Sequence, residues 1–436
     1  LYLLAAAGIA VFGILGMVTL FHYLRHRHET FPCPAVADVE LPKVTVQLPI
    51  YNERFVVERL IRAAISLKYP SDKLQIQVID DSTDDTTEIA AAQVELYRQR
   101  GFDIQLLHRS NRHGFKAGAL GEALETAIGE FVAVFDADFQ PQPDFLRNTI
   151  PHFLSEERLG MVQTRWGHLN PFDSQLTAAQ TIALDKHFAM EQTVRHRAQM
   201  FPKFNGSAGV WRRACLDDAG GWETDTVCED LCLSTRAILK DWDFLYLNEI
   251  VSPAELPSTI SAYKNQQSRW AKGSTQCLVK YGPEILQNPR HPLVARAYAL
   301  LSMAGYTTHL LLLLLLLVQV PLIYLDFRPP MLMLIFGLVG MAQPALFVMG
   351  QRDLYSKWWL RLRVFPSLLL IAFGLAPSNR RASAEALASN DHTFVRTPTG
   401  NLVSGQKNRF FSQPKHGYRL PVDWMVVVEL LLAVYA

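Results

Sequence analysis

The sequence predicts an α/β protein with a mainly parallel sheet and transmembrane helices at both ends of the chain. Hydrophobic residues make up 49% of the 436 residues, and nearly all the long apolar runs lie near the two ends. Between about residues 30 and 295, short strand-like runs alternate with helical patterns, as in parallel sheets covered on both faces by helices. The net charge of +1 argues against a nucleic-acid partner.

The first element is an apolar stretch over residues 1–24, in which His22 is the only side chain that can carry a charge. At about 1.5 Å per residue it is long enough to cross a ~30 Å hydrocarbon core. The basic sequence Arg-His-Arg-His follows over residues 25–28. By the positive-inside rule, the chain leaves this helix on the cytosolic side. A cleaved signal peptide would have a shorter apolar region with its basic residues first.

Residues 30–295 are therefore expected to form a cytosolic domain, and residues 296–436 a second membrane region. Two apolar stretches, 297–325 and 329–349, predict spans, and residues 422–436 begin another. Residues 364–376 are also apolar but shorter, and arginines flank them on both sides. Such flanks favour a helix that lies in the cytosolic interface, or a re-entrant one, over a span. We expect an integral membrane protein, in the plasma or inner membrane if bacterial, with the lipid bilayer as a partner.

Polar residues follow three of the four predicted strands in the middle domain, which cover residues 44–49, 74–79, 104–107 and 131–135. They are Tyr51, Asn52 and Glu53 after the first strand, Asp80 and Asp81 after the second, and Asp136 and Asp138 after the fourth. Ligands of such sheets bind at the carboxyl ends of the strands. One acidic strand end is more often a turn or a helix cap. Two strand ends with paired carboxylates predict a ligand site.

The Asp136-Ala137-Asp138 sequence suits a divalent cation. Mg²⁺ and Mn²⁺ prefer oxygen ligands, and they often take one or two carboxylates together with substrate phosphates. A bound cation would neutralise the charge that develops on a diphosphate leaving group. The pattern alone is common, but here it follows a strand of Phe, Val and Ala directly. We expect Mg²⁺ or Mn²⁺ at this point.

Two later clusters also contain candidate site residues. Glu229 and Asp230 precede a helical pattern, where acidic residues could simply cap the first turn. Gln266, Arg269 and Trp270 have the spacing i, i+3, i+4 and so share one face of a helix. An arginine suits a diphosphate and a tryptophan suits a sugar ring. The alternative is an amphipathic helix whose tryptophan lies at the membrane surface.

Together, these clusters resemble the family-2 glycosyltransferases of GT-A fold, and more narrowly the cellulose-synthase-like mannan and glucan synthases. The resemblance runs from about residue 44 to residue 273 and keeps the order of the motifs, with Cys228 where many members have threonine before Glu-Asp. It implies an inverting, metal-dependent hexosyltransferase. Such an enzyme would move glucose or mannose from UDP-glucose or GDP-mannose to a growing β-linked polysaccharide, for which the resemblance implies 1,4 linkages. The helical pattern over residues 174–197 would be one of the family's interface helices, with an ordinary surface helix as the alternative.

The resemblance also implies a role for each site residue. Donor-binding residues would be Tyr51, Glu53, Asp80, Asp81, Lys116, Asp136, Gln266 and Arg269. The metal ligands would be Asp138 and Asp136. Asp230 would be the general base, with Glu229 as the first alternative, and Arg269 would stabilise the leaving diphosphate. Acceptor-binding residues would be Trp270, Asn205 and Gly206.

Residues 390–401 resemble the gating loop of cellulose-synthase-like enzymes, so Arg396 and Thr397 are also predicted to bind the donor, although a plain linker has a similar composition. A second hypothesis keeps the same donor site but transfers one sugar to a lipid acceptor of the ceramide, diacylglycerol or polyprenyl phosphate type. A third hypothesis is an inactive membrane scaffold. Intact Asp138, Asp230 and Arg269 argue against it.

Overall fold

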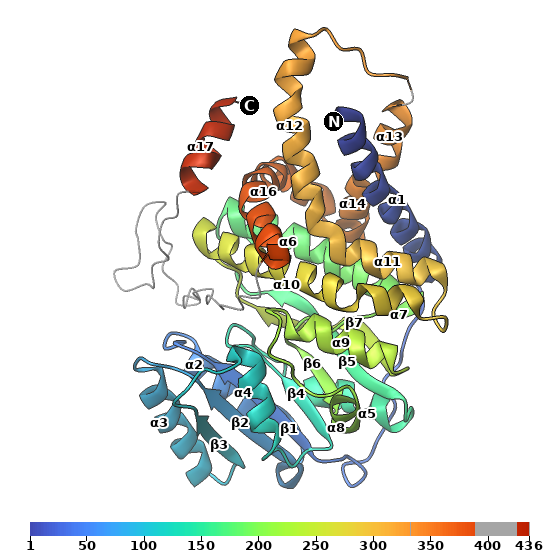
Figure 1. The fold of residues 1–436 in the computed structure, drawn as a ribbon. Coiled ribbons are helices and arrows are strands. Elements are labelled where there is room, and N and C mark those ends of the chain that lie inside the picture. The colour runs from blue at the N-terminus through green and yellow to red at the C-terminus, as the bar shows by residue number, and fades with distance from the viewer. Residues whose placement is uncertain (332, 389–424, 436) are drawn as a thin grey trace.

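The computed structural model describes residues 1–331, 333–388 and 425–435. It has a sheet domain at one end and a group of long apolar helices at the other, with further helices between them (Figure 1). Both ends of the chain lie on the side of the apolar helices (Figure 1). The predicted gating-like loop, residues 390–401 with Arg396 and Thr397, lies outside the described residues.

The sheet has seven strands in the order β3-β2-β1-β4-β6-β5-β7. Their bounds are β1 Val44–Ile50, β2 Leu74–Asp80, β3 Ile104–His108, β4 Phe131–Val134, β5 Leu159–His168, β6 Gly209–Arg212 and β7 Asp243–Ala254. Strands β1 to β4 pair in parallel, as do β5 and β7, whereas β6 is antiparallel to both β4 and β5. The prediction of a mainly parallel sheet is therefore confirmed.

Helices cover both faces of this sheet, which separates two hydrophobic clusters. Strands β2 and β4 are buried along their whole length, because parallel strands with helices on both faces meet no solvent. The helices of the sheet domain are α2 Val57–Ile65, η1 Ser71–Lys73, α3 Thr86–Gln99, α4 Phe115–Leu124, α5 Phe145–Leu154, α8 Arg213–Asp218 and α9 Glu229–Leu239.

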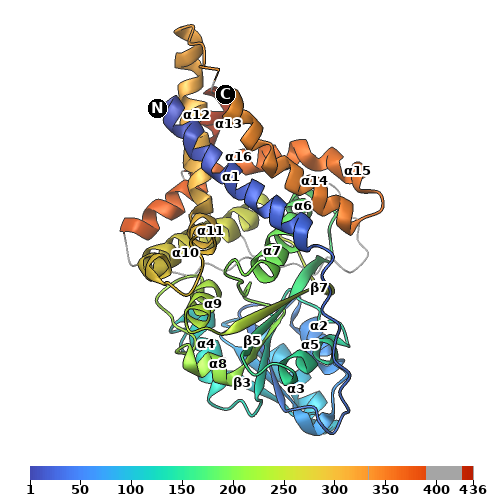
Figure 2. The ribbon, with the colours of Figure 1, turned by 90° about the vertical axis from the view of Figure 1, so that its right-hand side faces the viewer.

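A middle layer joins the sheet to the apolar helices (Figure 2). One part is a nearly continuous helix made of α6 Gln175–Asp185, the π-helical segment η2 Lys186–Gln192 and α7 Thr193–Arg197. It begins at Ser174, whose hydroxyl accepts a hydrogen bond from the backbone N–H of Thr177. The other part is α10 Ile260–Gln287. Much of α6 is buried, since it packs against α14 and α16, and so it is not an ordinary surface helix.

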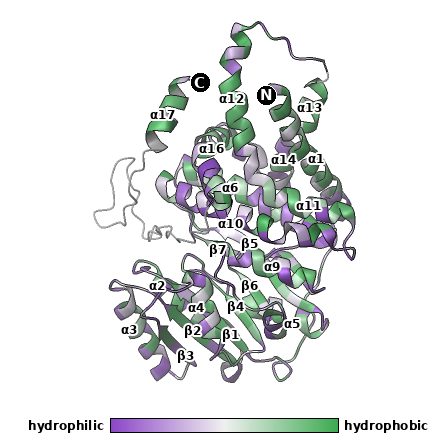
Figure 3. Cartoon of the chain, viewed as in Figure 1, coloured by the Kyte–Doolittle hydropathy of each residue, from purple (hydrophilic) through white to green (hydrophobic). Residues whose placement is uncertain are grey.

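The apolar helices include α1 Tyr2–His26, α11 Leu293–Met303, η3 Ala304–Tyr306, α12 Thr307–Tyr324, α13 Met333–Gly340, α14 Ala342–Leu354, α15 Trp358–Arg361, η4 Leu362–Val364, α16 Phe365–Ala388 and α17 Met425–Tyr435. Within the described part of the chain, four helical segments are long and apolar enough to cross a membrane: Tyr2–His26, Leu293–Tyr324, Met333–Leu354 and Trp358–Ala388. Figure 3 shows the hydrophobic colouring gathered on these helices.

The last of these segments contains residues 364–376, for which the sequence predicts a position in the interface. Here α16 packs against α10, α6 and α12. It runs across the direction of α12 rather than along it (Figure 2). The segment Trp358–Ala388 is also long and apolar enough to span a bilayer. Its place in the interface stays a prediction.

A buried polar cluster joins the sheet domain to the apolar helices. The carboxylate of Asp185 on α6 accepts hydrogen bonds from Gln351 Nε2 at 2.9 Å and Arg361 Nη2 at 3.1 Å, and lies 3.2 Å from His168 Nε2. Burial alone would raise the pKa of Asp185, but these partners hold it below the usual value. The carboxylate therefore stays charged and ties the two regions together.

Candidate active site

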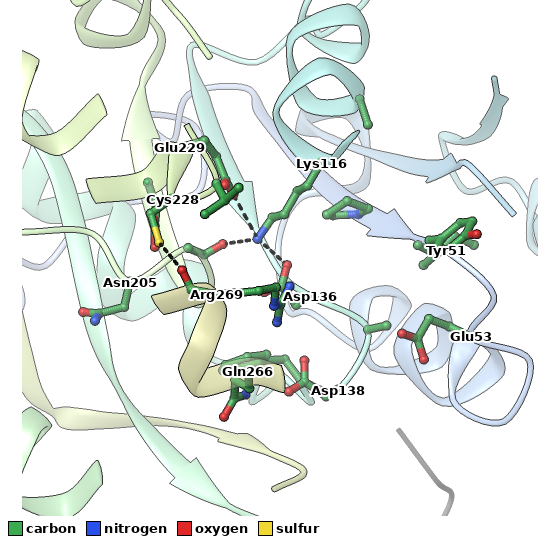
Figure 4. A pocket seen from close by; sticks show the side chains of 18 of the residues that line it. Tyr51, Glu53, Lys116, Asp136, Asp138, Asn205, Cys228, Glu229, Gln266 and Arg269 are labelled. Atoms are coloured by element: carbon green, nitrogen blue, oxygen red, sulfur yellow. Dashed lines mark hydrogen bonds and ion pairs between the residues drawn. The ribbon is translucent and has the colours of Figure 1, made fainter. Parts of the chain in front are cut away.

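A single cavity at the carboxyl ends of β1, β2 and β4 gathers most of the predicted site residues. Those that line it are Tyr51, Glu53, Asp81, Lys116, Asp136, Asp138, Asn205, Gly206, Glu229, Asp230, Gln266, Arg269 and Trp270. They come from elements far apart in the sequence and converge on one space (Figure 4). The position agrees with the rule that open α/β sheets bind ligands at the carboxyl ends of their strands.

Among the predicted donor residues that the structure describes, Asp80 is the one that does not line this cavity. Its buried carboxylate accepts hydrogen bonds from Ser82 N–H at 2.9 Å and Thr87 Oγ1 at 2.6 Å, and lies 2.8 Å from His108 Nδ1. These contacts hold the turn between β2 and α3. The structure therefore gives Asp80 a position behind the site, where it shapes the loop that carries its neighbour.

Asp81 does line the cavity, and it is paired with Arg109, which the sequence reading missed. Arg109 donates from Nε and Nη2 to the two carboxylate oxygens of Asp81, at 2.7 and 2.6 Å. Hydrogen bonding to Asp81 raises the pKa of Arg109. This bidentate pair holds the Asp81 carboxylate in a fixed orientation at the cavity wall.

Arg112 is a second site residue that the sequence reading missed. Its guanidinium carbon lies 3.3 Å from the centroid of the Tyr51 ring, and both residues line the cavity. An arginine in this position makes a cation–π contact with the ring. The only sequence signal was an arginine in the loop after a predicted strand, which is too common to be informative.

Lys116, near the start of α4, is the centre of a charge cluster (Figure 4). Its Nζ donates to Asp136 Oδ1 at 2.5 Å and to the carbonyl of Gly206 at 2.8 Å, and lies 3.8 Å from Glu229 Oε1. Burial alone would lower the pKa of Lys116, but the neighbouring carboxylates, Asp136 first, raise it. Lys116 therefore links the predicted metal-binding loop to the predicted catalytic helix.

The carboxylates around Asp138 fit a divalent cation. Burial raises the pKa of Asp138 above its usual value, and the negative charge of Asp136, and then of Glu53 and Glu255, raises it further. Such an excess of negative charge suits a bound cation. Among the residues that the structure describes, no three His, Cys, Asp or Glu side chains are arranged to hold a metal by themselves. A cation here would complete its ligands with substrate phosphates, as Mg²⁺ and Mn²⁺ often do.

Glu229 and Asp230 lie in the first turn of α9, where Glu229 is beside Lys116 and Asp230 is beside Gly206. Asp230 Oδ1 accepts a hydrogen bond from the backbone N–H of Leu231 at 2.8 Å. Burial raises the pKa values of both carboxyls, and Lys116 opposes the change. A carboxylate whose pKa is raised toward neutrality is a better proton acceptor, so either group could serve as a general base.

A glycine lets α10 approach this pair closely. A Cβ atom at Gly273 would lie 2.2 Å from the Sγ of Cys228, the residue directly before Glu229. Cys228 Sγ also donates to the carbonyl of Arg269, at 3.9 Å. The close contact brings the face of α10 with Gln266, Arg269 and Trp270 to the cavity, and the spacing i, i+3, i+4 turns all three side chains toward it.

The model of the glycosyltransferase-like family 2 matches residues 42–273, which is more than half of the chain. The chain belongs to this family. The matched region contains every cavity residue from Tyr51 to Trp270.

Curated relatives of this family-2 chain include plant enzymes. It is 40% identical over 293 residues to "Glucomannan 4-beta-mannosyltransferase 1" of Cyamopsis tetragonoloba, an alignment that covers 66% of this chain and 56% of the relative. It is 42% identical over 265 residues to "Glucomannan 4-beta-mannosyltransferase 2" of Arabidopsis thaliana, with 60% and 50% covered. The chain thus spans about half the length of the curated relatives it matches.

Among solved structures, the family-2 chain is similar to a mannosyltransferase from Pyrobaculum calidifontis, solved in complex with GDP-Man and Mn²⁺. The TM-score is 0.60, the sequence identity is 21%, and the superposition covers 89% of this chain and 99% of the other. The likeness confirms the predicted GT-A fold.

Proposed function

We propose that this chain transfers mannose from GDP-mannose, with inversion, to a growing β-1,4-linked mannan or glucomannan chain. The observation that carries the proposal is the single cavity, in which Asp136 and Asp138, Asp230, and Arg269 with Trp270 meet. The identity of 40 to 42% to two plant enzymes named as glucomannan 4-β-mannosyltransferases supports mannose over glucose, and a polysaccharide acceptor over a lipid.

The acceptor side needs a general base and no protein nucleophile. Asp230 takes the proton from a hydroxyl group of the acceptor sugar, and the resulting oxygen attacks the anomeric carbon of the donor. A new C–O bond forms as the bond from the anomeric carbon to the diphosphate oxygen breaks. A single displacement inverts the configuration, so an α-linked donor gives a β-linked product. Trp270 gives the acceptor sugar an aromatic face to lie on.

The donor side must hold the nucleotide and stabilise the leaving diphosphate. Tyr51 and Asp81 line the end of the cavity where the base and ribose fit, and Arg269 supplies a guanidinium to the diphosphate. Asp138 and Asp136 would hold Mg²⁺ or Mn²⁺, which supplies positive charge to the leaving group. Lys116 holds Asp136 and the Gly206 carbonyl close to α9, the helix that carries Glu229 and Asp230.

We further propose that the sheet domain is cytosolic, so that it meets the nucleotide-sugar pool. Basic residues end α1 and follow it, at Arg25, His26 and Arg27. By the positive-inside rule, this end of the helix lies in the cytosol, and the sheet domain follows it along the chain.

The proposal is tested with membranes that contain the chain, incubated separately with radiolabelled GDP-mannose and UDP-glucose. The expected result is label from GDP-mannose in an insoluble or ethanol-precipitable polymer. Label that extracts into organic solvent as a monosaccharide lipid would support the lipid-acceptor alternative and contradict the polymer proposal. Label from UDP-glucose alone would contradict the donor.

A further inference from the structure

The nearly continuous helix of α6, η2 and α7 changes to π-helical geometry over η2, Lys186–Gln192. A π-helical turn is closed by a hydrogen bond between residues i and i+5 instead of i and i+4, is rare in proteins, and is often found at functional sites. Here it brings two side chains, His187 and Gln192, to Asn205, a residue that lines the cavity. The rare geometry therefore lies next to the candidate active site.

The side-chain amide of Asn205 is held at both ends. Its Nδ2 lies 3.1 Å from His187 Nε2, and its Oδ1 accepts a hydrogen bond from Gln192 Nε2 at 2.5 Å. Its backbone N–H donates to Gln163 Oε1 at 2.9 Å. These contacts leave the amide one N–H and one oxygen lone pair for another partner.

The contact between His187 and Asn205 has a defined direction. His187 Nδ1 lies 2.7 Å from Glu191 Oε2, and Lys186 pairs with the same carboxylate. Burial alone would raise the pKa of Glu191, but Lys186 and His187 hold it well below the usual value. Burial lowers the pKa of His187 to about 4. The imidazole is therefore neutral and the carboxylate ionised.

A carboxylate can only accept, so the hydrogen of the neutral imidazole lies on Nδ1 and points to Glu191. The Nε2 atom of His187 is then an acceptor, and it takes a hydrogen bond from Asn205 Nδ2. Glu191 thus sets the tautomer of His187. His187 in turn sets the orientation of the Asn205 amide, with Nδ2 toward the imidazole and Oδ1 toward Gln192.

Asn205 lies at the end of the cavity away from Tyr51 and Glu53 (Figure 4). The next residue, Gly206, has φ +83°, and a Cβ atom there would lie 3.0 Å from Asp230 Oδ2. The oriented amide thus belongs to the residue directly before Gly206, and Gly206 lies against the candidate base Asp230. A sugar hydroxyl both donates and accepts a hydrogen bond, which matches the remaining N–H and lone pair of the amide.

We propose that His187 is a positioning residue for the acceptor sugar: held by Glu191, it orients the Asn205 amide to bind a hydroxyl of the acceptor beside Asp230. This inference rests on the proposed transfer to a sugar acceptor. Neither His187 nor Glu191 is among the residues that line the cavity, so we expect their substitution to leave nucleotide binding unchanged.

Two substitutions of His187 by an amide side chain distinguish a positioning role from a packing role. In H187Q, the glutamine amide reaches the place of Nε2 and can still accept from Asn205. In H187N, the shorter amide reaches only the place of Nδ1. We expect H187N to raise the KM for the oligosaccharide acceptor about fivefold to tenfold, the effect of one hydrogen bond. For H187N, the KM for GDP-mannose and the kcat at saturating acceptor should stay within about twofold of the wild-type values. For H187Q, all of these kinetic constants, including the KM for the acceptor, should stay within the same range.

Asn205→Ala and the double variant H187N/N205A complete the test, with His28→Asn, at an exposed histidine, as the matched control. Asn205→Ala should raise the acceptor KM by a similar factor, and H187N should add little in the N205A background. The inference would be overturned if H187Q and H187N raised the acceptor KM equally. It would also be overturned if H187N raised the acceptor KM as much in the N205A background as it does in the wild-type protein. Wild-type protein that transfers no mannose to any sugar acceptor would instead overturn the proposed function.

Discussion

The Nζ atom of Lys116 lies 2.5 Å from Oδ1 of Asp136, so the first carboxylate of the Asp-Ala-Asp sequence is ion-paired. Asp138, the second carboxylate, has its pKa raised by burial and by the charge of its acidic neighbours. Lys116 therefore pairs with Asp136, whereas the charged neighbours that act most strongly on Asp138 are other carboxylates. For the proposed cation, this asymmetry predicts that Asp138 contributes more to binding than Asp136 does.

Removal of divalent metal should abolish transfer. We expect EDTA to stop incorporation of mannose and Mn²⁺ or Mg²⁺ to restore it, because the cation would neutralise the leaving diphosphate. Asp138→Asn should weaken Mn²⁺ binding to the protein with GDP more than Asp136→Asn does. The binding is measured by titration calorimetry, and full turnover in exhaustively chelated enzyme would contradict the metal assignment.

Asp230→Asn should remove transfer and leave nucleotide binding nearly intact. Asparagine has a similar shape but cannot take a proton, and a general base typically contributes about 10²–10⁴-fold in rate. The neighbouring Glu229→Gln is the matched control, and it should keep much more of the activity. The rate of transfer and the Kd for GDP are measured for both. If Glu229→Gln loses more activity than Asp230→Asn, the base is Glu229.

Substitutions of the two adjacent residues on α10 should act on different steps. Arg269→Ala should lower kcat, because the guanidinium stabilises charge that develops on the leaving diphosphate. Trp270→Ala should raise the KM for the acceptor and change the affinity for GDP little, because an indole face stacks on a sugar ring. Steady-state kinetics with both substrates varied separates the two. A drop in GDP affinity for Trp270→Ala alone would reverse these roles.

The pH profile of transfer should fall on its acidic side at a pH above the usual carboxyl range near 4. Burial raises the pKa of Asp230 and of Glu229, and a base must be ionised to accept a proton, so activity is lost as the pH falls through the raised value. The two carboxyls titrate together, and the profile reports the pair. We would measure kcat/KM from pH 4 to pH 9; an acidic limb at pH 4 or below would contradict the buried setting of the pair.

The contact between Asp185 and Arg361 should contribute strongly to stability. Asp185→Ala leaves Arg361 and His168 facing a buried gap, and loss of one partner from a buried ion pair costs about 3–5 kcal/mol. Asp217→Ala, which removes an exposed partner of Arg213 in a helix, is the control and should cost less than about 1 kcal/mol. Thermal unfolding in detergent compares the two, and equal Tm values would show that the cluster does not join the two regions.

The sequence predicted β1 to β4 because parallel strands buried on both faces appear as short apolar runs between turns. It did not reveal β5, β6 or β7. Strand β6 has the sequence Gly-Val-Trp-Arg, and β5 ends in Arg165, Trp166, Gly167 and His168, so neither has the apolar pattern of a central strand. Both depend on partners distant in the sequence, β6 on β4 and β5 on β7. That pairing leaves no local signal.

The acidic site residues were predictable because each follows a strand or begins a helix. Arg109 and Arg112 were not, because each lies in a loop, and only the fold brings them to Asp81 and Tyr51. Glu255 comes to the cavity from the end of β7, which the sequence did not predict. The bond between His187 and Asn205 depends on a π-helical turn, and no residue pattern known to us predicts such a turn.

The linkage of the product tests the central claim most directly. Membranes with the wild-type chain, and matched membranes with Asp230→Asn, are given radiolabelled GDP-mannose and an oligosaccharide acceptor, and the product is digested with an endo-β-1,4-mannanase. We expect the wild-type product to be released as short manno-oligosaccharides and the Asp230→Asn membranes to form almost no product. A polymer that resists this enzyme but yields to an α-mannosidase would contradict inverting β-1,4 transfer.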